Sequence, residues 1–181
     1  MKILVTGGAG FVGTNLIKRL INENHEVVSI DNYSIGSTQN HIVGVIYHDM
    51  DVNTIHTLTN DFNLIFHLAG LSRIQPSFSD PTQTFRANTC GVEAVLEWTR
   101  AKKTKVVYSG SSSKHHNPYQ SPYAFYKYLG EEMCRMYRKT YAMPIEIVRF
   151  YNVYGPSEIT QGDWAAVIGL WRHQVVKGGP I

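Results

Sequence analysis

The stretch that decides the fold is Lys2–Gly13, KILVTGGAGFVG. Its first residues, through Val5, form a short apolar run typical of a strand that is buried on both faces of a sheet. Glycines follow at positions 7, 10 and 13, and an amphipathic helix is expected from Phe11. Glycines between a strand and a helix allow a tight turn and let backbone N–H groups approach a phosphate, whose charge the helix N-terminus stabilises. This order therefore predicts a loop that binds the phosphates of a dinucleotide.

Asp31 carries the second part of this motif. It ends the next expected strand, eighteen residues after Gly13, close to the spacing of about 20 that is typical of dinucleotide-binding folds. A carboxylate in this place can accept hydrogen bonds from the adenosine ribose and would repel a 2′-phosphate, so NAD is favoured over NADP. The alternative is a plain glycine turn followed by an exposed aspartate.

Apolar runs alternate with amphipathic stretches along the chain. The expected strands are Lys2–Val5, Val27–Ile30, Val45–Tyr47, Leu64–His67, Lys105–Tyr108 and Ile145–Phe150. The expected helices are Phe11–Asn24, Val52–Asn60, Pro81–Lys102, Tyr123–Tyr141 and Trp164–Lys177. This alternation predicts an α/β fold with a Rossmann-like, doubly wound parallel sheet. Polar stretches at 33–44 and 109–121 are expected as loops, and both follow strands, where open α/β sheets bind their ligands.

Composition limits the class of protein. Of the 181 residues, 43% are hydrophobic and 17% are charged, which is typical of a globular domain and excludes a disordered or collagen-like chain. Two cysteines, Cys90 and Cys134, are too few for a disulfide framework and are expected as buried free thiols. The net charge of +3 is small and its lysines and arginines are scattered, so nucleic acid is not an expected partner. We expect no membrane span, no signal peptide and a cytoplasmic protein.

Tyr123 and Lys127 lie four residues apart on an expected helix and therefore share a face. Lowering the pKa of a phenol from about 10 to about 7 or 8 takes roughly 3–4 kcal/mol, and an ammonium about 4 Å away supplies about that much at an effective dielectric near 20. Ser111, just after the fifth expected strand, could orient a substrate hydroxyl. A tyrosinate general base is therefore predicted. The alternative, a solvated helix face, is disfavoured by the dinucleotide loop upstream.

Taken in order, these motifs resemble those of the extended short-chain dehydrogenase/reductase family, and within it the nucleotide-sugar epimerases. The match runs from Met1 to about Gly155. The segments that carry it are TGGAGFVG (6–13), DNYS (31–34), DM (49–50), HLAG (67–70), Asn88 with Gly91, Ser111, SPY (121–123) with Lys127, and RFYNVYGP (149–156). Several motifs in one order are more specific than any one alone.

The resemblance implies a role for each matching residue. Cofactor binding is implied for Gly7, Gly10, Phe11, Val12, Gly13, Asp31, Asn32, Ser34, Asp49, Met50, Leu68, Ala69, Gly70, Asn88, Tyr123, Lys127 and Tyr151. Catalysis is implied for Ser111, Tyr123 and Lys127, and substrate binding for Ser112, Ser113 and Asn152.

The activity that the resemblance implies is an NAD-dependent epimerisation of a nucleotide sugar of the UDP-hexose type. Tyr123 would remove a proton from a sugar hydroxyl while a hydride passes to NAD, and the hydride would return to the other face of the keto-sugar. Family members commonly pair through two long helices, so a homodimer through helices 81–102 and 123–141 is expected. Residues 1–155 would form the NAD-binding domain, and 156–181 the start of a substrate-binding domain that is otherwise missing.

The sequence departs from the family pattern in places that bear on the substrate. KHH at 114–116 stands where relatives carry Val-Tyr-Gly, and the loop 111–123 is short. Ser72, with Arg73 beside it, replaces a lysine found in some epimerases. Contact between the two histidines and a substrate phosphate stays open. No metal site is expected there, because no cysteine or carboxylate lies nearby at a ligand spacing.

Other functions also stay open. A dehydratase is disfavoured, because Ser112-Ser113 stands where those enzymes typically place Asp-Glu. A reductase or a decarboxylase of nucleotide sugars is not excluded. A non-catalytic NAD-binding fragment, or one subunit of a split enzyme, would fit the missing C-terminal part.

Overall fold

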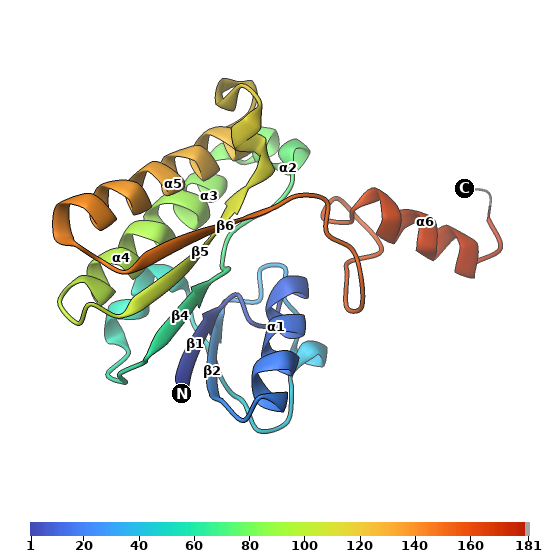
Figure 1. Cartoon of the computed structure of the whole chain (residues 1–181). Coiled ribbons are helices and arrows are strands. Elements are labelled where there is room, and N and C mark those ends of the chain that lie inside the picture. Colours follow the sequence, from blue (N-terminus) through green and yellow to red (C-terminus); the bar gives the residue numbers. More distant parts are fainter. Residues whose placement is uncertain (180–181) are drawn as a thin grey trace.

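The protein has an α/β fold built around one parallel sheet (Figure 1). The computed structural model describes residues 1–179. The strands lie in the order β3-β2-β1-β4-β5-β6. They are β1 (Lys2–Thr6), β2 (Glu26–Asp31), β3 (Ile46–Asp49), β4 (Leu64–His67), β5 (Lys105–Ser111) and β6 (Ile145–Phe150). This is the doubly wound strand order of Rossmann folds, so the fold class predicted from the sequence is confirmed.

Helices lie between the strands along the chain, and one more helix follows the last strand. The α-helices of the described residues are α1 (Phe11–Asn22), α2 (Ile74–Ser79), α3 (Pro81–Phe85), α4 (Gly91–Arg100), α5 (Pro122–Tyr141) and α6 (Val167–Val176). A π-helical turn, Arg86–Cys90, joins α3 to α4. Short 3₁₀ turns occupy Thr38–Asn40, Val52–Thr57, Ser112–His115 and Pro118–Gln120. Within residues 1–179, no helix is both long enough and apolar enough to cross a lipid bilayer.

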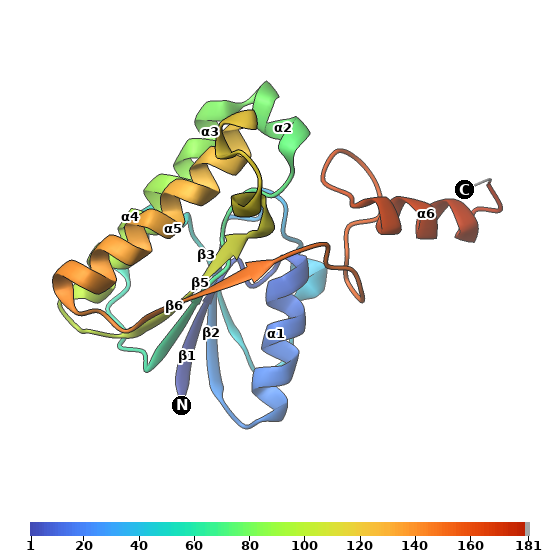
Figure 2. The same ribbon diagram turned by 45° about the horizontal axis from the view of Figure 1, so that its top comes forward.

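The two faces of the sheet are covered by different helices. Ile3 and Val5 of β1 pack with Ile17 of α1 in one apolar cluster. Leu4, between them, belongs to the opposite cluster together with Val95 of α4. Because side chains alternate along a strand, this arrangement requires a helical layer on each face. Figures 1 and 2 show α1 on one face and α4 with α5 on the other.

The ligand-binding edge of the sheet is set by this topology. The chain leaves β1 through α1 on one face and leaves β4 through α2, α3 and α4 on the other. β1 and β4 are neighbours, so the connections diverge between them and open a crevice beyond their carboxyl ends. The backbone there is held by bonds between neighbouring strand ends, with Gly7 N–H donating to the Ile30 carbonyl and Leu68 N–H donating to the Thr6 carbonyl.

The start of α5 is fixed at this edge by two serines. The Ser121 hydroxyl accepts a hydrogen bond from the Ala124 N–H at 3.1 Å and so caps the helix. Pro122 takes the first helical position, where its missing N–H costs nothing. From α2, the Ser77 hydroxyl accepts from the Tyr123 N–H at 3.1 Å. These contacts fix the helical turn that carries Tyr123.

The helix predicted over Val52–Asn60 is wrong in type. The segment forms a 3₁₀ helix over Val52–Thr57 instead. Val52, Ile55 and Leu58 are buried at intervals of three residues, which matches the three residues per turn of a 3₁₀ helix. Asp51 caps its start by accepting from the Asn53 N–H at 2.8 Å.

Other elements also differ from prediction. β5 continues to Ser111 because residues 109–111 pair with 148–150 of β6, so the predicted loop 109–121 begins too early. The last helix begins at Val167 and not at Trp164, because the Ala165 N–H closes a turn onto the Gly162 carbonyl. Helix α2 was not predicted, since IQPSFS has no helical apolar pattern.

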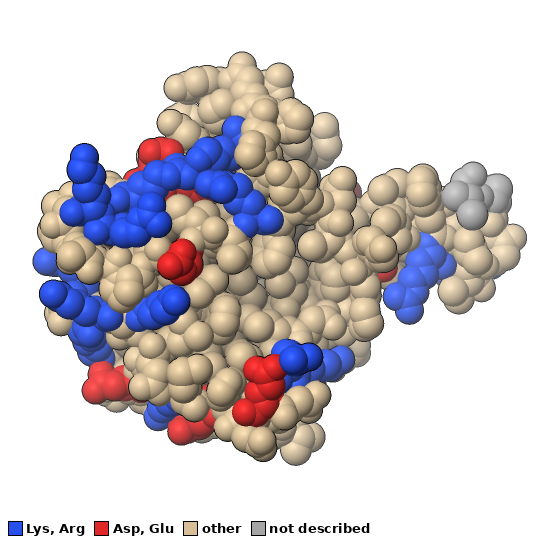
Figure 3. Space-filling model, in the orientation of Figure 1, with Lys and Arg blue, Asp and Glu red and all other residues tan. Residues whose placement is uncertain are grey.

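Beyond β6 the chain leaves the sheet. α6 and the loop before it project past the carboxyl ends of the strands (Figures 1 and 2). The face of this projection seen in Figure 3 carries few charges. The apolar residues Val167, Trp171 and Val175 of α6 are exposed. The proposed division at residue 155 stays a prediction.

Candidate active site

A cavity of about 1350 Å³ opens beyond the carboxyl ends of the strands. All but two of the site residues predicted from the sequence line it. They are Gly7, Gly10, Phe11, Val12, Gly13, Asp31, Asn32, Ser34, Met50, Leu68, Ala69, Gly70, Ser111, Ser112, Ser113, Tyr123, Lys127, Tyr151 and Asn152. The loop before α6 contributes further wall residues, among them Glu158 and Trp164. Residues from both ends of the chain therefore share one cavity.

The two exceptions lie outside the cavity wall. Asn88 is buried, and its amide donates to the Leu71 carbonyl and accepts from the Leu71 N–H, each at 2.9 Å. It therefore holds the segment after β4, and Leu71 itself lines the cavity. Asp49 is exposed at the end of β3 and pairs with Asp31 in the sheet register. Their roles in cofactor binding stay predictions.

The glycine turn brings β1 and α1 into close contact. Gly7 has φ +73°, and a Cβ there would lie 2.8 Å from the Ala69 nitrogen. A Cβ on Gly13 would lie 2.2 Å from the Gly7 carbonyl oxygen. No side chain caps the first turn of α1, whose N-cap is Gly10. The backbone N–H groups of that turn are thus available to an anion at the cavity edge, and a phosphate fits there.

Asp31 lies beside this turn and is 9% exposed. Its carboxylate accepts from the Ala9 N–H and from the Tyr33 N–H, both at 2.9 Å. Burial raises the pKa of Asp31, and the two backbone hydrogen bonds oppose that rise. Each oxygen has a further lone pair, so the carboxylate can also accept from a ribose hydroxyl. Asp31, the residue that would bind the ribose, therefore also connects the loop after β2 to the glycine turn through these two hydrogen bonds.

Next to Asp31, the cavity wall is formed by polar groups and one methionine. The Asn32 amide donates to the Asp51 carboxylate at 3.1 Å and accepts from the Ser34 N–H at 3.1 Å. Met50 and Asp51 line the same part of the cavity. Asp51 was not among the predicted residues. An apolar surface with polar neighbours suits an adenine ring and its ribose.

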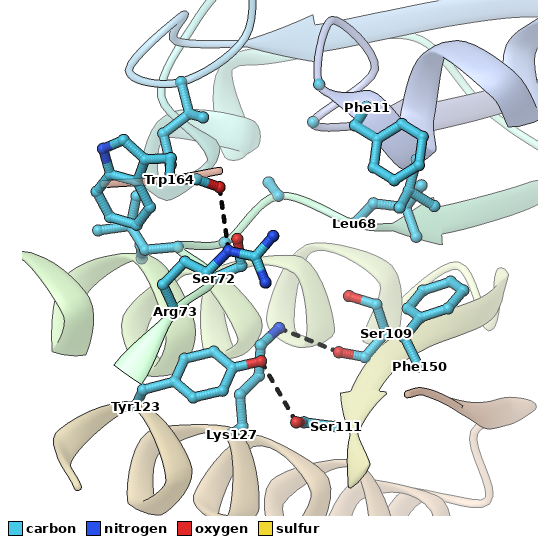
Figure 4. Close-up of a pocket in the computed structure, with 18 of the residues that line it drawn as sticks. Phe11, Leu68, Ser72, Arg73, Ser109, Ser111, Tyr123, Lys127, Phe150 and Trp164 are labelled. Atoms are coloured by element: carbon cyan, nitrogen blue, oxygen red, sulfur yellow. Dashed lines mark hydrogen bonds between the residues drawn. The ribbon is translucent and has the colours of Figure 1, made fainter. Parts of the chain in front are cut away.

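At the other side of the cavity, Ser111, Tyr123 and Lys127 come together (Figure 4). The Tyr123 hydroxyl donates to the Ser111 hydroxyl at 3.3 Å. Lys127 is 8% exposed, and its ammonium donates to the Ser109 carbonyl at 3.1 Å. The same nitrogen lies 5.5 Å from the centroid of the Tyr108 ring. The phenol and the serine are thus placed for proton transfer, and the Lys127 ammonium is held at the end of β5 by the Ser109 carbonyl.

The electrostatics of this group differ from the expectation that Lys127 lowers the pKa of Tyr123. Burial raises the pKa of Tyr123; the Ser111 hydrogen bond and the charge of Arg73 oppose the rise. Burial also lowers the pKa of Lys127 from 10.5 to about 8, which the negative charge of Glu131 opposes. Lys127 is directed at the Ser109 carbonyl, and the cation whose charge opposes the raised pKa of the phenol is Arg73.

The serines after β5 form a chain of hydroxyls. The Ser113 hydroxyl donates to Ser111 at 2.9 Å, and the Ser113 N–H donates to the same oxygen at 3.2 Å. The ring of Tyr151 stacks on His115, with centroids 6.0 Å apart. Tyr151 and Asn152 are exposed and line the same cavity. The KHH segment therefore lies beside the cavity, with His116 among the lining residues.

Two contributors were missed by reasoning from the sequence. Ser77 fixes the first turn of α5 but belongs to a helix without an apolar pattern. Arg73 was noted only as the neighbour of Ser72. Its role depends on a contact with Trp164, 91 residues away, and no local signal predicts such a contact.

Comparison with known proteins agrees with this geometry. A family model described as the NAD dependent epimerase/dehydratase family matches residues 3–181. The chain belongs to this family. NAD, the cofactor predicted from the sequence, is the cofactor of the family, and the glycine turn and Asp31 fit it.

Individual relatives differ in the activity that their names describe. The chain is 31% identical to a UDP-glucose 4-epimerase of Mycolicibacterium smegmatis, over 98% of this chain and 64% of the relative. It is 28% identical to a UDP-N-acetyl-alpha-D-glucosaminuronate decarboxylase of Bacillus cytotoxicus, over 98% of this chain and 62% of the relative. The chain thus spans less than two thirds of the length of these relatives.

This chain also matches about two thirds or less of the length of similar proteins whose structures are solved. The Thermotoga maritima UDP-glucose 4-epimerase with UDP-glucose superposes with a TM-score of 0.92 at 25% identity, covering 100% of this chain and 65% of that one. The Bordetella bronchiseptica enzyme WbmF in complex with NAD⁺ superposes with a TM-score of 0.86 at 31% identity, covering 99% of this chain and 61% of that one.

Proposed function

We propose that the protein is an NAD-dependent epimerase of nucleotide sugars of the UDP-hexose type. The observation that carries the proposal is the hydrogen bond between Tyr123 and Ser111 inside a cavity whose other end is formed by the glycine turn and Asp31. In this proposal a base, a hydroxyl-orienting group and a dinucleotide site would share one cavity. Three of the relatives named above carry a UDP-sugar in their names, which supports this substrate class.

The residues around the cavity suggest how NAD would be held. The N-terminus of α1 would bind the diphosphate, and Asp31 with Asn32 would bind the adenosine ribose. Lys127 would bind the second ribose, because its buried ammonium lies against Gly70 and the end of β5. Bound NAD would supply the hydride acceptor and a positive charge beside Tyr123.

Tyr123 and Ser111 would then act on the proton of the reacting sugar hydroxyl. Tyr123, once deprotonated, would accept the proton of the sugar hydroxyl that is being oxidised and return it on re-reduction. The Ser111 oxygen has two lone pairs, which can accept from Tyr123 and from one of the two nearby donor groups of Ser113, so its own O–H can donate to a substrate oxygen. Ser111 would therefore fix the position of the reacting hydroxyl. Ser112, Ser113 and Asn152 would complete the contacts with the substrate.

Two other functions are weaker candidates. A dehydratase needs an acid and a base for water loss, and Ser112 and Ser113 supply neither. A binding protein without turnover is favoured by the length of the chain relative to its relatives. It leaves the Ser111–Tyr123–Lys127 group without a role, which is why we place it second.

The test is turnover by the 181-residue chain. The chain is incubated with NAD and a panel of UDP-sugars, and the products are analysed by NMR for epimers. We expect interconversion, and we expect Tyr123→Phe to lower kcat by about 10²–10⁴ while NAD affinity stays within about threefold. Tyr119→Phe, which alters an exposed tyrosine in the same region, is the matched control. Bound NAD without any turnover would refute the proposal.

A further inference from the structure

Arg73 adopts an unusual backbone conformation at the cavity wall. It follows β4, directly before α2, and has φ +98° and ψ 136°. Residues with a Cβ rarely adopt positive φ, and such strained positions cluster at ligand-binding sites. This one is held in place by the buried contacts on either side, in which Asn88 binds Leu71 and Ser77 binds the start of α5. The fold therefore fixes the direction in which Arg73 leaves the backbone.

The side chain is anchored at only one of its nitrogens. Arg73 Nε donates to the Trp164 carbonyl at 3.0 Å, which links the segment after β4 to the loop before α6. No carboxylate within residues 1–179 forms an ion pair with Arg73. Five other arginines do pair with glutamates; they are Arg19, Arg100, Arg135, Arg149 and Arg172. The two terminal NH₂ groups of Arg73 thus lack an anionic partner in the described structure.

The guanidinium extends into the cavity on the side of the Tyr123 hydroxyl (Figure 4). Its charge acts on that hydroxyl, against the rise in pKa that burial causes. In the proposed function, the reacting sugar carbon must lie at Tyr123 and Ser111. A group that meets Arg73 therefore belongs to the sugar or to the phosphate next to it, and not to the nucleobase.

We propose that Arg73 binds a carboxylate carried by the sugar, so that the preferred substrates are nucleotide-linked uronic acids. The two free NH₂ groups can hold both oxygens of a carboxylate at once, a geometry that a lysine cannot provide. A neutral hexose would leave the phosphate next to the sugar as the only anionic group of the substrate that could pair with this partly buried cation. The proposal rests on the proposed function only for the place of the sugar.

The test measures binding, so that it does not depend on turnover. Dissociation constants of UDP-glucuronate, UDP-glucose and UDP are measured by calorimetry on the NAD-loaded 181-residue chain. We expect wild type to bind UDP-glucuronate at least tenfold more tightly than UDP-glucose. Arg73→Met should weaken UDP-glucuronate binding by about 30-fold or more and change the other two by less than about threefold. Arg73→Lys should restore part of the loss, because it keeps the charge and loses the second hydrogen bond.

Arg138→Met, which removes an exposed arginine far along α5, controls for the loss of one positive charge and should leave all three constants unchanged. Equal weakening of the three ligands by Arg73→Met would assign the residue to the diphosphate and overturn the proposal. So would a wild-type preference for UDP-glucose, which needs no variant to observe. Turnover is measured on the same samples. Uronate preference without epimer formation would refute the proposed function alone, and epimer formation without uronate preference would refute this inference alone.

Discussion

Lys127 is a buried cation, and its burial lowers the free energy of unfolding of the protein. Its ammonium has one hydrogen bond, to Ser109, and burial lowers its pKa from 10.5 to about 8. Below pH 8 the lysine is charged in both the folded and the unfolded chain, and folding must remove that charge from water. Between pH 8 and 10.5 the folded protein holds the neutral amine while the unfolded chain stays protonated. Stability therefore rises with pH in this window.

Lys127→Met should remove this cost. We expect the variant to gain about 1–3 kcal/mol in the free energy of unfolding at pH 7, with the difference shrinking toward pH 10.5. It should also bind NAD more weakly, because the ribose contact is lost. Urea unfolding at several pH values measures the first effect, and calorimetry with NAD measures the second. A variant that is less stable than wild type at pH 7 would show that the lysine supports the fold.

At Gly13, the glycine turn leaves no space for a side chain. A Cβ there would lie 2.2 Å from the Gly7 oxygen and 2.6 Å from the Gly8 Cα, and both are backbone atoms. Gly13→Ala should therefore destabilise the protein by about 2–4 kcal/mol and abolish NAD binding. Gly44→Ala is the control, since Gly44 has φ +87° but no atom near its Cβ position. It should cost only about 1 kcal/mol and leave NAD affinity unchanged. If Gly13→Ala and Gly44→Ala changed the free energy of unfolding and the NAD affinity equally, the close backbone contact at Gly13 would be contradicted.

Single residues were predictable where a local pattern carries the information. Tyr123 and Lys127 followed from a spacing of four on a helix, and Asp31 from its distance to the glycine turn. Arg73 did not, because its position depends on a positive φ and on a carbonyl far along the chain. The sequence also placed Lys127 against Tyr123. The structure directs the lysine at the Ser109 carbonyl, which only the extension of β5 brings within reach.

Among the elements, α5 and β6 are joined by a buried carboxylate. Glu131 is 1% exposed; it accepts from Arg149 through both oxygens, from Arg135 at 2.9 Å, and lies 3.6 Å from the Lys114 ammonium. Burial raises the pKa of Glu131, but the hydrogen bonds and charge of Arg149 outweigh this and hold it below its usual range. Figure 3 shows lysines and arginines gathered over this part of the molecule. The network ties the helix of Tyr123 to the sheet.

Arg149→Met should cost about 2–4 kcal/mol in the free energy of unfolding, because it takes three hydrogen bonds from a buried charge. The double variant Glu131→Met, Arg149→Met should be more stable than this single variant. Because the folded pKa of Glu131 is depressed, the advantage of wild type over the double variant should be present above pH 4.5 and be lost as the pH falls below it. Denaturation at pH 7 and pH 3 checks both. A double variant as unstable as the single variant would exclude the buried charge as the cause.

Elements were predictable in proportion to their periodicity. The six strands were found because each is a short apolar run between turn residues. The segment after β3 was assigned the wrong type of helix, although its apolar spacing of three already indicates a 3₁₀ helix. α2 escaped notice because its sequence lacks a clear periodicity and its contact with α5, from the Tyr123 N–H to the Ser77 hydroxyl, is tertiary.

For the whole molecule, we expect a homodimer formed through the helices in 81–102 and 123–141. Exposed apolar side chains on this surface include Phe85, Met136 and Tyr141. Light scattering should give about twice the mass of one chain, and Met136→Glu should shift it toward the monomer. Lys139→Glu, which also alters the exposed part of α5, is the control for a change of charge. A monomeric mass for wild type would contradict this expectation.

In the proposed reaction, one cavity oxidises a sugar carbon and reduces it again without release of the hydride. The direct measurement uses a UDP-sugar deuterated at the carbon whose configuration changes, with the NAD-loaded 181-residue chain. NMR and mass spectrometry then locate the label in the product. We expect wild type to form an epimer that retains deuterium at that carbon, and we expect the Tyr123→Phe variant to form no epimer. Loss of the deuterium to solvent, or an epimer formed equally well by the variant, would contradict it.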